Sequence, residues 1–330
     1  MKKNEIIGVD VSKLKLDLYL HTTQRHFVVE NNHKGFAELI EKSIVTTRCK
    51  PEDLLVCFEN TGKYSRPLST FLQSQNIRFA MLSALEIKRS LGMTRGKNDK
   101  VDAFRIANYA HQKRETLSPT ILPGPMIDKM KSLLSLREKL IRHRTAYKNG
   151  LTDVNDCHYE GENDLYIQIQ KDMIEQINDK VKKIEAELQR IIQGDQALER
   201  NYKLVTSVIG VGPIIAFYLI ACTDNFTSFD NPRSFACFAG IAPFEVSSGI
   251  RKGNARVHPY ANKQLKSLLN MGAMSAIVTP GELKNYFRAR KKEGKNNMST
   301  MNIIRNKIVF RIFAVVKRGT PYVNHQKFAA

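Results

Sequence analysis

The chain has 330 residues, an apolar fraction of 42% and a formal net charge of +20. The length suggests two or three domains, and the ordinary apolar fraction excludes a wholly disordered chain. Such an excess of Lys and Arg favours a polyanionic partner such as nucleic acid, because neutralised phosphates release counterions. Charge alone does not separate an enzyme acting on nucleic acid from a ribosomal or nucleoid-type binder.

The cysteines and the apolar runs narrow the class further. Five scattered cysteines show no paired spacing and no close histidine, which favours reduced thiols over disulfides or a zinc site. The longest apolar run, residues 208–222, contains two glycines and a proline, so it is too short and too interrupted to span a bilayer. No signal peptide is recognisable. We therefore expect a cytoplasmic protein without a membrane segment.

The first third of the chain alternates between strand and helix patterns. Three consecutive apolar or alternating runs, at residues 6–11, 14–20 and 26–29, predict strands joined by polar turns. The elements predicted to follow are helix 34–46, strand 54–58, helix 64–75 and strand 78–82. This order, an antiparallel meander continued by parallel crossovers, is that of the α/β RNase-H/RuvC-like fold. We expect this domain to occupy residues 1–120.

The middle third predicts a helical hairpin over residues 121–198. From Ile174 to Ile191 the apolar residues recur at alternating spacings of three and four, a heptad seam of about two and a half repeats. An earlier helix, at about 126–147, has its apolar residues on one side, and the polar stretch 149–164 is the expected hairpin tip. Because so short a seam is marginal alone, we expect an antiparallel hairpin or a dimerising coiled coil.

The last third, residues 199–330, is predicted to be mainly helical. Gly210 and Gly212 lie in a turn flanked by apolar residues that resembles a helix-hairpin-helix, whose turn amides can hold a backbone phosphate. A tight packing turn is the alternative interpretation. Helical patterns resume at 262–277 and 299–317. Between them lies a basic cluster, a second candidate for nucleic-acid contact, which contains Arg288, Arg290, Lys291 and Lys292.

Four acidic residues form a candidate metal site. Asp10 interrupts an apolar strand, where an ionised carboxylate is costly without a partner or a metal. Glu59 ends the fourth predicted strand. Asp99 and Asp102 are three residues apart at the start of a predicted helix, so both face one side of it. In the RNase-H-like order the first and fourth strands are neighbours, and the helix can carry its two acids over them.

Four carboxylates on one patch repel each other strongly unless cations lie between them. Two Mg²⁺ ions about 4 Å apart, with Mn²⁺ as an alternative, would satisfy the cluster and assist in-line phosphodiester chemistry. Plainer interpretations exist for single residues. Asp99 can be only a helix N-cap, and Asp10 can be the phosphate-loop acid of a sugar-kinase or actin-like ATPase. The combination of all four acids in this order favours the metal site.

A pair of serines offers a second candidate for chemistry. Ser247 and Ser248 directly precede Gly249, which frees the backbone at a turn, so that either hydroxyl can stand exposed. A solvated loop serine is the default interpretation of such a pair.

Taken together, these motifs resemble the DEDD transposases of bacterial insertion sequences, which are related to the pilin-gene DNA invertases. The resemblance extends over nearly the whole chain. The segments that carry it are residues 8–13, 59–62, 97–103, 209–212, 239–243 and 248–249. Each segment alone is a weak signal, and together they are specific.

The resemblance implies a transposase or site-specific recombinase that cuts and rejoins DNA. It implies that Asp10, Glu59, Asp99 and Asp102 bind metal. It also implies that a serine before Gly249 attacks DNA and becomes a covalent phosphoserine, with Ser248 as the first choice and Ser247 as the runner-up. The implied partners are donor and target DNA, a structured bridge RNA as guide, and further copies of the chain in a dimer or tetramer, in which the acids of one subunit meet the serine of another.

One segment departs from the family pattern. After the serine the family often reads Lys-x-Gly-Asn before a Leu-Arg helix, whereas residues 258–266 read His-Pro-Tyr-Ala-Asn-Lys-Gln-Leu-Lys. The DNA contacts of the family are therefore not transferred to this segment. Three rival functions stay open: a RuvC-type junction resolvase that uses metal-activated water, a kinase-like ATPase, and a nucleic-acid-binding protein without enzymatic activity.

Overall fold

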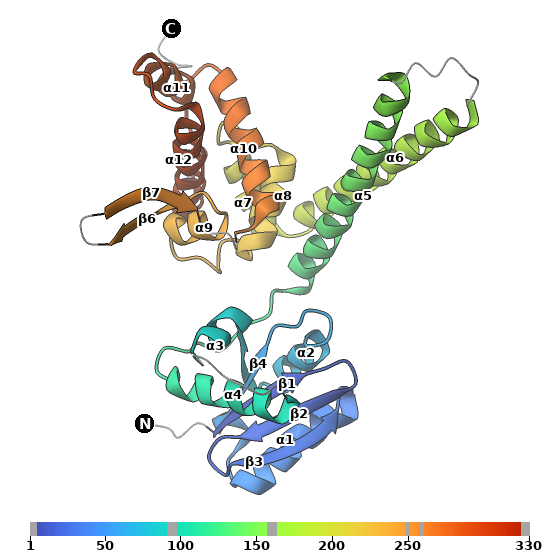
Figure 1. Cartoon of the computed structure of the whole chain (residues 1–330), viewed down its shortest axis with the longest axis vertical. Coiled ribbons are helices and arrows are strands. Elements are labelled where there is room, and N and C mark those ends of the chain that lie inside the picture. Colours follow the sequence, from blue (N-terminus) through green and yellow to red (C-terminus); the bar gives the residue numbers. More distant parts are fainter. Residues whose placement is uncertain (1–4, 91–97, 157–163, 249–250, 258–260, 325–330) are drawn as a thin grey trace. The chain divides into compact units, whose positions relative to one another are not determined.

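The structure is a computed structural model that describes residues 5–90, 98–156, 164–248, 251–257 and 261–324. The chain folds as two compact units, Met1–Leu122 and Pro123–Ala330 (Figure 1). The first unit has a mixed α/β architecture, and the second is mostly helical. Each unit has its own hydrophobic core.

A five-stranded sheet forms the centre of the first unit, in the order β3-β2-β1-β4-β5. Its antiparallel half contains β1 (Glu5–Val11), β2 (Lys15–Leu20) and β3 (Arg25–Glu30). Its parallel half runs from β1 through β4 (Leu54–Glu59) to β5 (Arg78–Leu82). The predicted meander, its parallel continuation and the pairing of the first strand with the fourth are therefore confirmed.

Two helices cover one face of this sheet. Side chains of α1 (His33–Thr47) and α2 (Arg66–Ser74) share a buried cluster with Ile7 and Val9 of β1. Asn32 is the N-cap of α1, because its side-chain oxygen accepts a hydrogen bond from the backbone N–H of Gly35, the third residue of the helix. A short 3-10 helix, Pro51–Asp53, leads into β4.

The opposite face of the sheet carries α3 (Ala84–Ser90) and α4 (Asp99–Gln112). Residues of both helices pack with Ile6 and with the alternate residues of β4 and β5. Gly8 makes the close approach of α4 possible, because a Cβ at this position would overlap the backbone carbonyl oxygen of Ala103. Consequently α4 packs directly on the central strand β1 and on its neighbour β2.

In the second unit, two long helices pack against each other in opposite directions: α5 (Pro125–Asp156) and α6 (Asp164–Gln193) (Figure 1). Three polar contacts fix their antiparallel register, since rising numbers in α5 meet falling numbers in α6. They join Lys129 to Glu187 at 2.6 Å, Arg137 to Glu185 at 2.8 Å, and Arg144 to Asn178 at 2.8 Å. Most of the predicted seam of α6 is buried, namely Ile177, Val181, Ile184, Leu188 and Ile191.

The helix predicted at 126–147 is longer than expected. In the structure α5 continues to Asp156, through much of the polar stretch that was expected to form the hairpin tip. That stretch contains no proline, so polarity alone did not end the helix. Gly150 lies against Gln170 of α6, where a Cβ would come within 2.9 Å of the side-chain amide oxygen. The interhelical contact therefore extends beyond the predicted end.

The remainder of the second unit surrounds α8 (Pro213–Thr223), whose residues from Ile215 to Ala221 are all buried. Most of the other elements of the unit are helices. They are α7 (Gln196–Thr206), α9 (Pro232–Phe238), α10 (Lys263–Val278), α11 (Glu282–Lys292) and α12 (Asn297–Arg318). A hairpin of β6 (Pro243–Ser248) and β7 (Arg251–Val257) follows α9. None of the helices in the described ranges is long and apolar enough to cross a membrane.

Candidate carboxylate site

The strand order places three acids on the sheet face that α4 covers. Along β1, Ile6 and Gly8 pack toward α4, so Asp10, two residues further on, lies on the same face. Asp17 of β2 is the direct antiparallel partner of Asp10. Glu59 ends β4, whose preceding alternate residues also belong to the cluster beneath α4. Because Val9 pairs with Phe58 in parallel register, the ends of β1 and β4 bring Asp10 and Glu59 together.

The first turn of α4 contributes the other two acids. Asn98 is the N-cap of this helix, and its side-chain oxygen accepts a hydrogen bond of 2.8 Å from the Lys100 N–H. Asp99 is therefore the first helical residue, and the interpretation of Asp99 as a mere N-cap is wrong. Asp102 follows one turn later and is one-quarter exposed. Since α4 lies on β1 and β2, both acids are carried toward the end of β1 that bears Asp10.

The neighbouring acids act electrostatically on Asp10. The pKa of Asp10 is raised from its ordinary value of 3.8 to about 6. Burial is the largest cause, because it disfavours the charged form, and repulsion from Asp102, Asp99, Asp17 and Glu59 adds to it. The other three predicted acids thus lie within electrostatic reach of Asp10, together with Asp17, which the sequence analysis did not single out.

Side-chain cations balance part of this negative charge. The Lys15 ammonium lies 3.2 Å from an Asp17 oxygen and 2.8 Å from an Asp99 oxygen. The other Asp17 oxygen contacts the His26 Nε2 at 2.9 Å. Arg105 pairs with Asp102 at 2.9 Å. Asp17 is almost fully buried, and its two cationic or hydrogen-bonding neighbours make that burial tolerable.

The donor chemistry fits a hard divalent cation, since the cluster offers carboxylate oxygens and its central acid is left with a raised pKa. Within the described part of the chain, however, no three Asp, Glu, His or Cys side chains lie close enough together to hold one metal ion. Lys15 and Arg105 contact oxygens of the two α4 acids instead. The acids are gathered, but they are not arranged as ligands in this state.

The sequence analysis missed Asp17 and Lys15, although a weak signal was present. Both lie in the alternating run 14–20, where polar residues between leucines ordinarily face solvent. Only the register of the β1–β2 hairpin shows that Asp17 faces Asp10. The turn between the strands, where the Lys15 carbonyl accepts hydrogen bonds from the Ser12 N–H and hydroxyl, sets that register.

The predicted serines belong to the second unit. Ser248 is the last residue of β6 and pairs with Arg251, and Ser247 pairs with Lys252. Gly249 lies outside the described residues, as do the side chains of both serines. The serines stand at the end of a hairpin strand, whereas the default interpretation of the sequence was a pair of solvated loop serines. Because the two units are not placed relative to each other, the serines and the acids stay separate candidates.

Two amide side chains anchor the base of this hairpin. Asn302 and Asn306, one turn apart on α12, both donate to the backbone carbonyl of Ile241, at 2.8 and 2.9 Å. Ile241 is fully buried and lies two residues before Pro243, the first residue of the hairpin. This double contact ties the entry of β6 to the longest helix of its surroundings. The sequence offered no signal for it, because asparagines within a helix usually face solvent.

The turn between α7 and α8 serves packing at its first glycine. Gly210 has a φ of +90°, and a Cβ there would overlap the backbone carbonyl oxygen of Gly272 in α10. Gly212 is different, because it is exposed, has open space around its Cα, and begins α8 without a side-chain cap. The packing interpretation is therefore sufficient for Gly210, whereas a phosphate contact stays a prediction at Gly212.

The basic cluster lies on a helix of its own, α11, and not in a connection between helices. Arg290, Lys291 and Lys292 form its last turn, where positive charge also favours the negative end of the helix dipole. Arg290 pairs with Glu293 at 2.9 Å. The Tyr286 ring of α11 has two cationic neighbours. One is Arg290 of the same helix, and the other is the Lys307 ammonium of α12, which lies 4.7 Å from the ring centroid.

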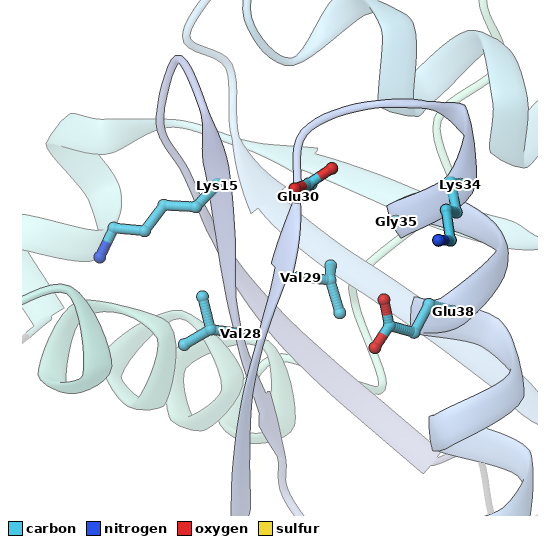
Figure 2. A pocket seen from close by; sticks show the side chains of 7 residues that line it. All are labelled: Lys15, Val28, Val29, Glu30, Lys34, Gly35 and Glu38. Carbon is cyan, nitrogen blue, oxygen red and sulfur yellow. The ribbon is translucent and has the colours of Figure 1, made fainter.

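A pocket of about 300 Å³ lies between β3 and α1 (Figure 2). Lys15 lines one wall, and its ammonium points away from Lys34 and Glu38 on the other side of the picture. None of the four predicted acids lines this pocket. The pocket and the carboxylate cluster therefore share only Lys15.

Comparison with known proteins assigns the chain to a family. The family model of the DEDD transposase of IS110, described as a transposase, matches residues 7–157. A second, described as transposase of the IS116/IS110/IS902 family, matches residues 202–288. The chain therefore carries transposase domains of the IS110 family. The predicted resemblance is thereby confirmed, and the first match contains all four acids.

Similar proteins point the same way. The pilin gene-inverting protein of Moraxella bovis is 24% identical over 335 aligned positions, covering 96% of this chain and 97% of that protein. Proteins of insertion element IS116 from Streptomyces clavuligerus and of IS110 from Streptomyces coelicolor are 25% and 26% identical, each over 36% of this chain and 29% of the relative. This chain is therefore a DNA transposase or recombinase enzyme with DNA as its substrate, and its DEDD domain implies dependence on a divalent metal.

Proposed function

We propose that this transposase cuts and rejoins the DNA of an insertion sequence through a carboxylate site of the RuvC-like kind and a separate serine nucleophile. The observation that carries the proposal is the convergence of acids from β2, β4 and α4 on Asp10 of β1, whose pKa is raised to about 6. Structural ion-pair networks also shift pKa values, but here the acids lie in the domain that matches a DEDD transposase.

The proposed ligands of the divalent metal are the four acids Asp10, Glu59, Asp99 and Asp102. The proposed metal is a pair of Mg²⁺ ions, for which Mn²⁺ could substitute. A metal so bound would polarise a DNA phosphate and stabilise the charge that develops on it. The protein supplies the positions. Asp10 stands on a central strand, and Gly8 lets α4 bring its two acids against that strand.

Ser248 is the proposed nucleophile, with Ser247 as the alternative. Its hydroxyl oxygen would bond to a DNA phosphorus as the bond from phosphorus to one deoxyribose oxygen breaks. The serine proton leaves and a proton is delivered to the released hydroxyl of the DNA, so that one phosphodiester is replaced by another. Rejoining is the reverse attack by a DNA hydroxyl. The phosphoserine bond keeps the free energy of the broken phosphodiester for rejoining, whereas hydrolysis by water would lose it.

The other parts of the chain would bind nucleic acid and further subunits. Exposed amides at Gly212 and the basic residues Arg288, Arg290, Lys291 and Lys292 of α11 are proposed contacts to phosphates of donor DNA, target DNA or a bridge RNA. The α5–α6 pair is proposed to act as a coiled coil that joins copies of the chain into a dimer or tetramer. In functional terms we divide the chain into a catalytic part (1–120), a hairpin (121–198) and a serine-bearing part (199–330), in the cytoplasm.

A covalent adduct tests this proposal. Incubation with supercoiled cognate DNA, guide RNA and Mg²⁺ is expected to attach the protein to one DNA end, visible as a shifted band on a denaturing gel. Ser248→Ala should lose the adduct while keeping fold and metal binding. Loss with Ser247→Ala instead would move the nucleophile by one residue. Cleavage by the wild type without any adduct would defeat the serine mechanism and leave a hydrolytic, resolvase-like nuclease.

A further inference from the structure

Lys15 connects two elements that carry acids. Its ammonium lies 3.2 Å from Asp17 of β2 and 2.8 Å from Asp99, the first residue of α4. Its backbone is fixed by the turn to β1, where its carbonyl oxygen accepts hydrogen bonds from the N–H and the hydroxyl of Ser12. One flexible side chain therefore holds the start of α4 beside the strand that pairs with Asp10.

The two carboxylates that Lys15 contacts are both part of the repulsion that raises the pKa of Asp10. Asp102, the other acid of α4, is paired with Arg105. Both acids of α4 are thus engaged by cationic side chains, and no three acids in the described ranges are arranged around a common point. In this state the positive charges of Lys15 and Arg105 neutralise the α4 carboxylates, as bound metal ions would.

Lys15 and a divalent cation would compete for the same Asp99 oxygen. A metal needs that oxygen at about 2.0–2.1 Å for Mg²⁺, whereas the ammonium already lies 2.8 Å from it. Lys15 is well suited to leave, because it is half exposed and its charge is at the end of a four-carbon stem. Lys15 also lines the open pocket between β3 and α1, and its ammonium extends away from the α1 wall of that pocket (Figure 2).

We propose that Lys15 is a positioning residue, an internal counter-ion that holds Asp99 against β2 in the metal-free protein and releases it when a divalent cation binds. This inference rests on the proposed metal site. It adds that assembly of the site is an exchange of cations, in which the first turn of α4 changes its partner from Lys15 to the metal. Lys15 would thereby weaken metal binding and stabilise the metal-free enzyme.

The test uses Mn²⁺ alone, bound to the full chain and measured by the loss of the free Mn²⁺ signal in electron paramagnetic resonance. Lys15→Met keeps the stem and removes the charge. Lys34→Met is the matched control, since it removes one charge from the opposite wall of the same pocket. We expect Lys15→Met to bind Mn²⁺ about threefold more tightly than the control. Lys15→Arg, which keeps the charge, should retain the wild-type affinity.

A second readout needs no metal. In the metal-free protein, hydrogen exchange at the first-turn amides of α4 should be faster in Lys15→Met than in Lys34→Met, and Mn²⁺ should remove the difference. Measurable but equal Mn²⁺ affinities in the two variants would overturn the role of Lys15 and leave the metal site standing. Absence of Mn²⁺ binding in the wild type and every variant would instead defeat the metal site itself, and this inference with it.

Discussion

Asp10 and Asp17 lie directly opposite each other on neighbouring antiparallel strands, so two carboxylates share one small area of the sheet. Like charges in such a cross-strand pair destabilise a sheet. The protein offsets the repulsion through Lys15 and His26, which contact Asp17, and by a raised pKa at Asp10. A fold that keeps such a pair gives up stability at this place, and the acids are therefore the first target for substitution.

Asp10→Asn and Asp102→Asn should each lower the rate of DNA strand cleavage by at least about 100-fold, because each removes one charge that would bind the metal with little change of shape. Cleavage of supercoiled cognate DNA in Mg²⁺ buffer measures the effect. The metal-free Asp10→Asn protein should also have a higher Tm than the wild type, since a half-buried, repelled carboxylate is lost. Wild-type cleavage by both variants would contradict the carboxylate mechanism.

Gly8→Ala should push α4 away from β1, because the added Cβ overlaps the Ala103 carbonyl oxygen. We expect a loss of about 3 kcal/mol in the free energy of unfolding, as for other overpacked cores. Urea unfolding followed by circular dichroism measures it. Gly124→Ala is the control, since nothing lies within 4 Å of a Cβ there. Equal stability of the two variants would show that α4 does not depend on Gly8.

A stacked pair of histidines should make the first unit sensitive to acid. His21 and His111 have ring centroids 3.9 Å apart. Burial, His21 and Arg114 lower the pKa of His111 below its ordinary value of 6.5, an effect that Glu5 partly opposes. The unfolded chain then binds the proton more readily, so stability should fall as the pH drops below about 6.5. In thermal unfolding between pH 5 and 8, the Tm of His21→Asn should change less with pH than the Tm of the wild type.

The asparagines of α12 should matter for the serine hairpin. Asn302→Ala and Asn306→Ala together would leave the buried Ile241 carbonyl without its two side-chain donors, at a cost of about 1–3 kcal/mol. We expect kcat for recombination to decrease by a larger factor than the affinity for DNA, because the hairpin loses the two hydrogen bonds that hold its first strand to α12. Asn270→Ala on the exposed side of α10 serves as the control. Unchanged kcat in the double variant would remove any positioning role.

The basic end of α11 should contribute to nucleic-acid affinity without sequence selectivity. Lys291→Gln with Lys292→Gln should reduce the slope of log K against log salt by about 2, because each phosphate contact releases a counterion. Filter binding of a cognate and an unrelated RNA of equal length at several salt concentrations measures this. A slope that does not change would place the phosphate contacts elsewhere.

The sequence was sufficient for the arrangement of the first unit, because strand order follows from local patterns and the pairing of neighbours. Asp10 and Glu59 could be placed together for that reason, and the helix that carries Asp99 and Asp102 began where expected. Asp17 could not be found, since its role depends on a register that is fixed by a turn. The double contact of Asn302 and Asn306 depends on packing between segments about 60 residues apart, which no local pattern reports.

The extent of α5 shows the same limit. Polar composition predicted a hairpin tip from residue 149, but the stretch contains no proline, and α5 continues through Gly150, which packs against Gln170 of α6, to Asp156. Conversely, the sequence analysis gave Gly210 and Gly212 the same interpretation, that of a turn that can bind phosphate. The packing shows that their roles differ, because only Gly210 lies against the backbone of α10.

The burial of α8 bears on how the chain is made on the ribosome. Tyr218 of this helix donates to the Leu134 carbonyl, 84 residues earlier, and the Tyr322 backbone N–H donates to the Ser207 hydroxyl, 115 residues earlier. The sheet unit needs nothing beyond Leu122 for its core and can fold while synthesis continues. The helical unit closes only when α12 has emerged. A message truncated before that point would give a folded carboxylate unit that lacks a folded serine-bearing partner.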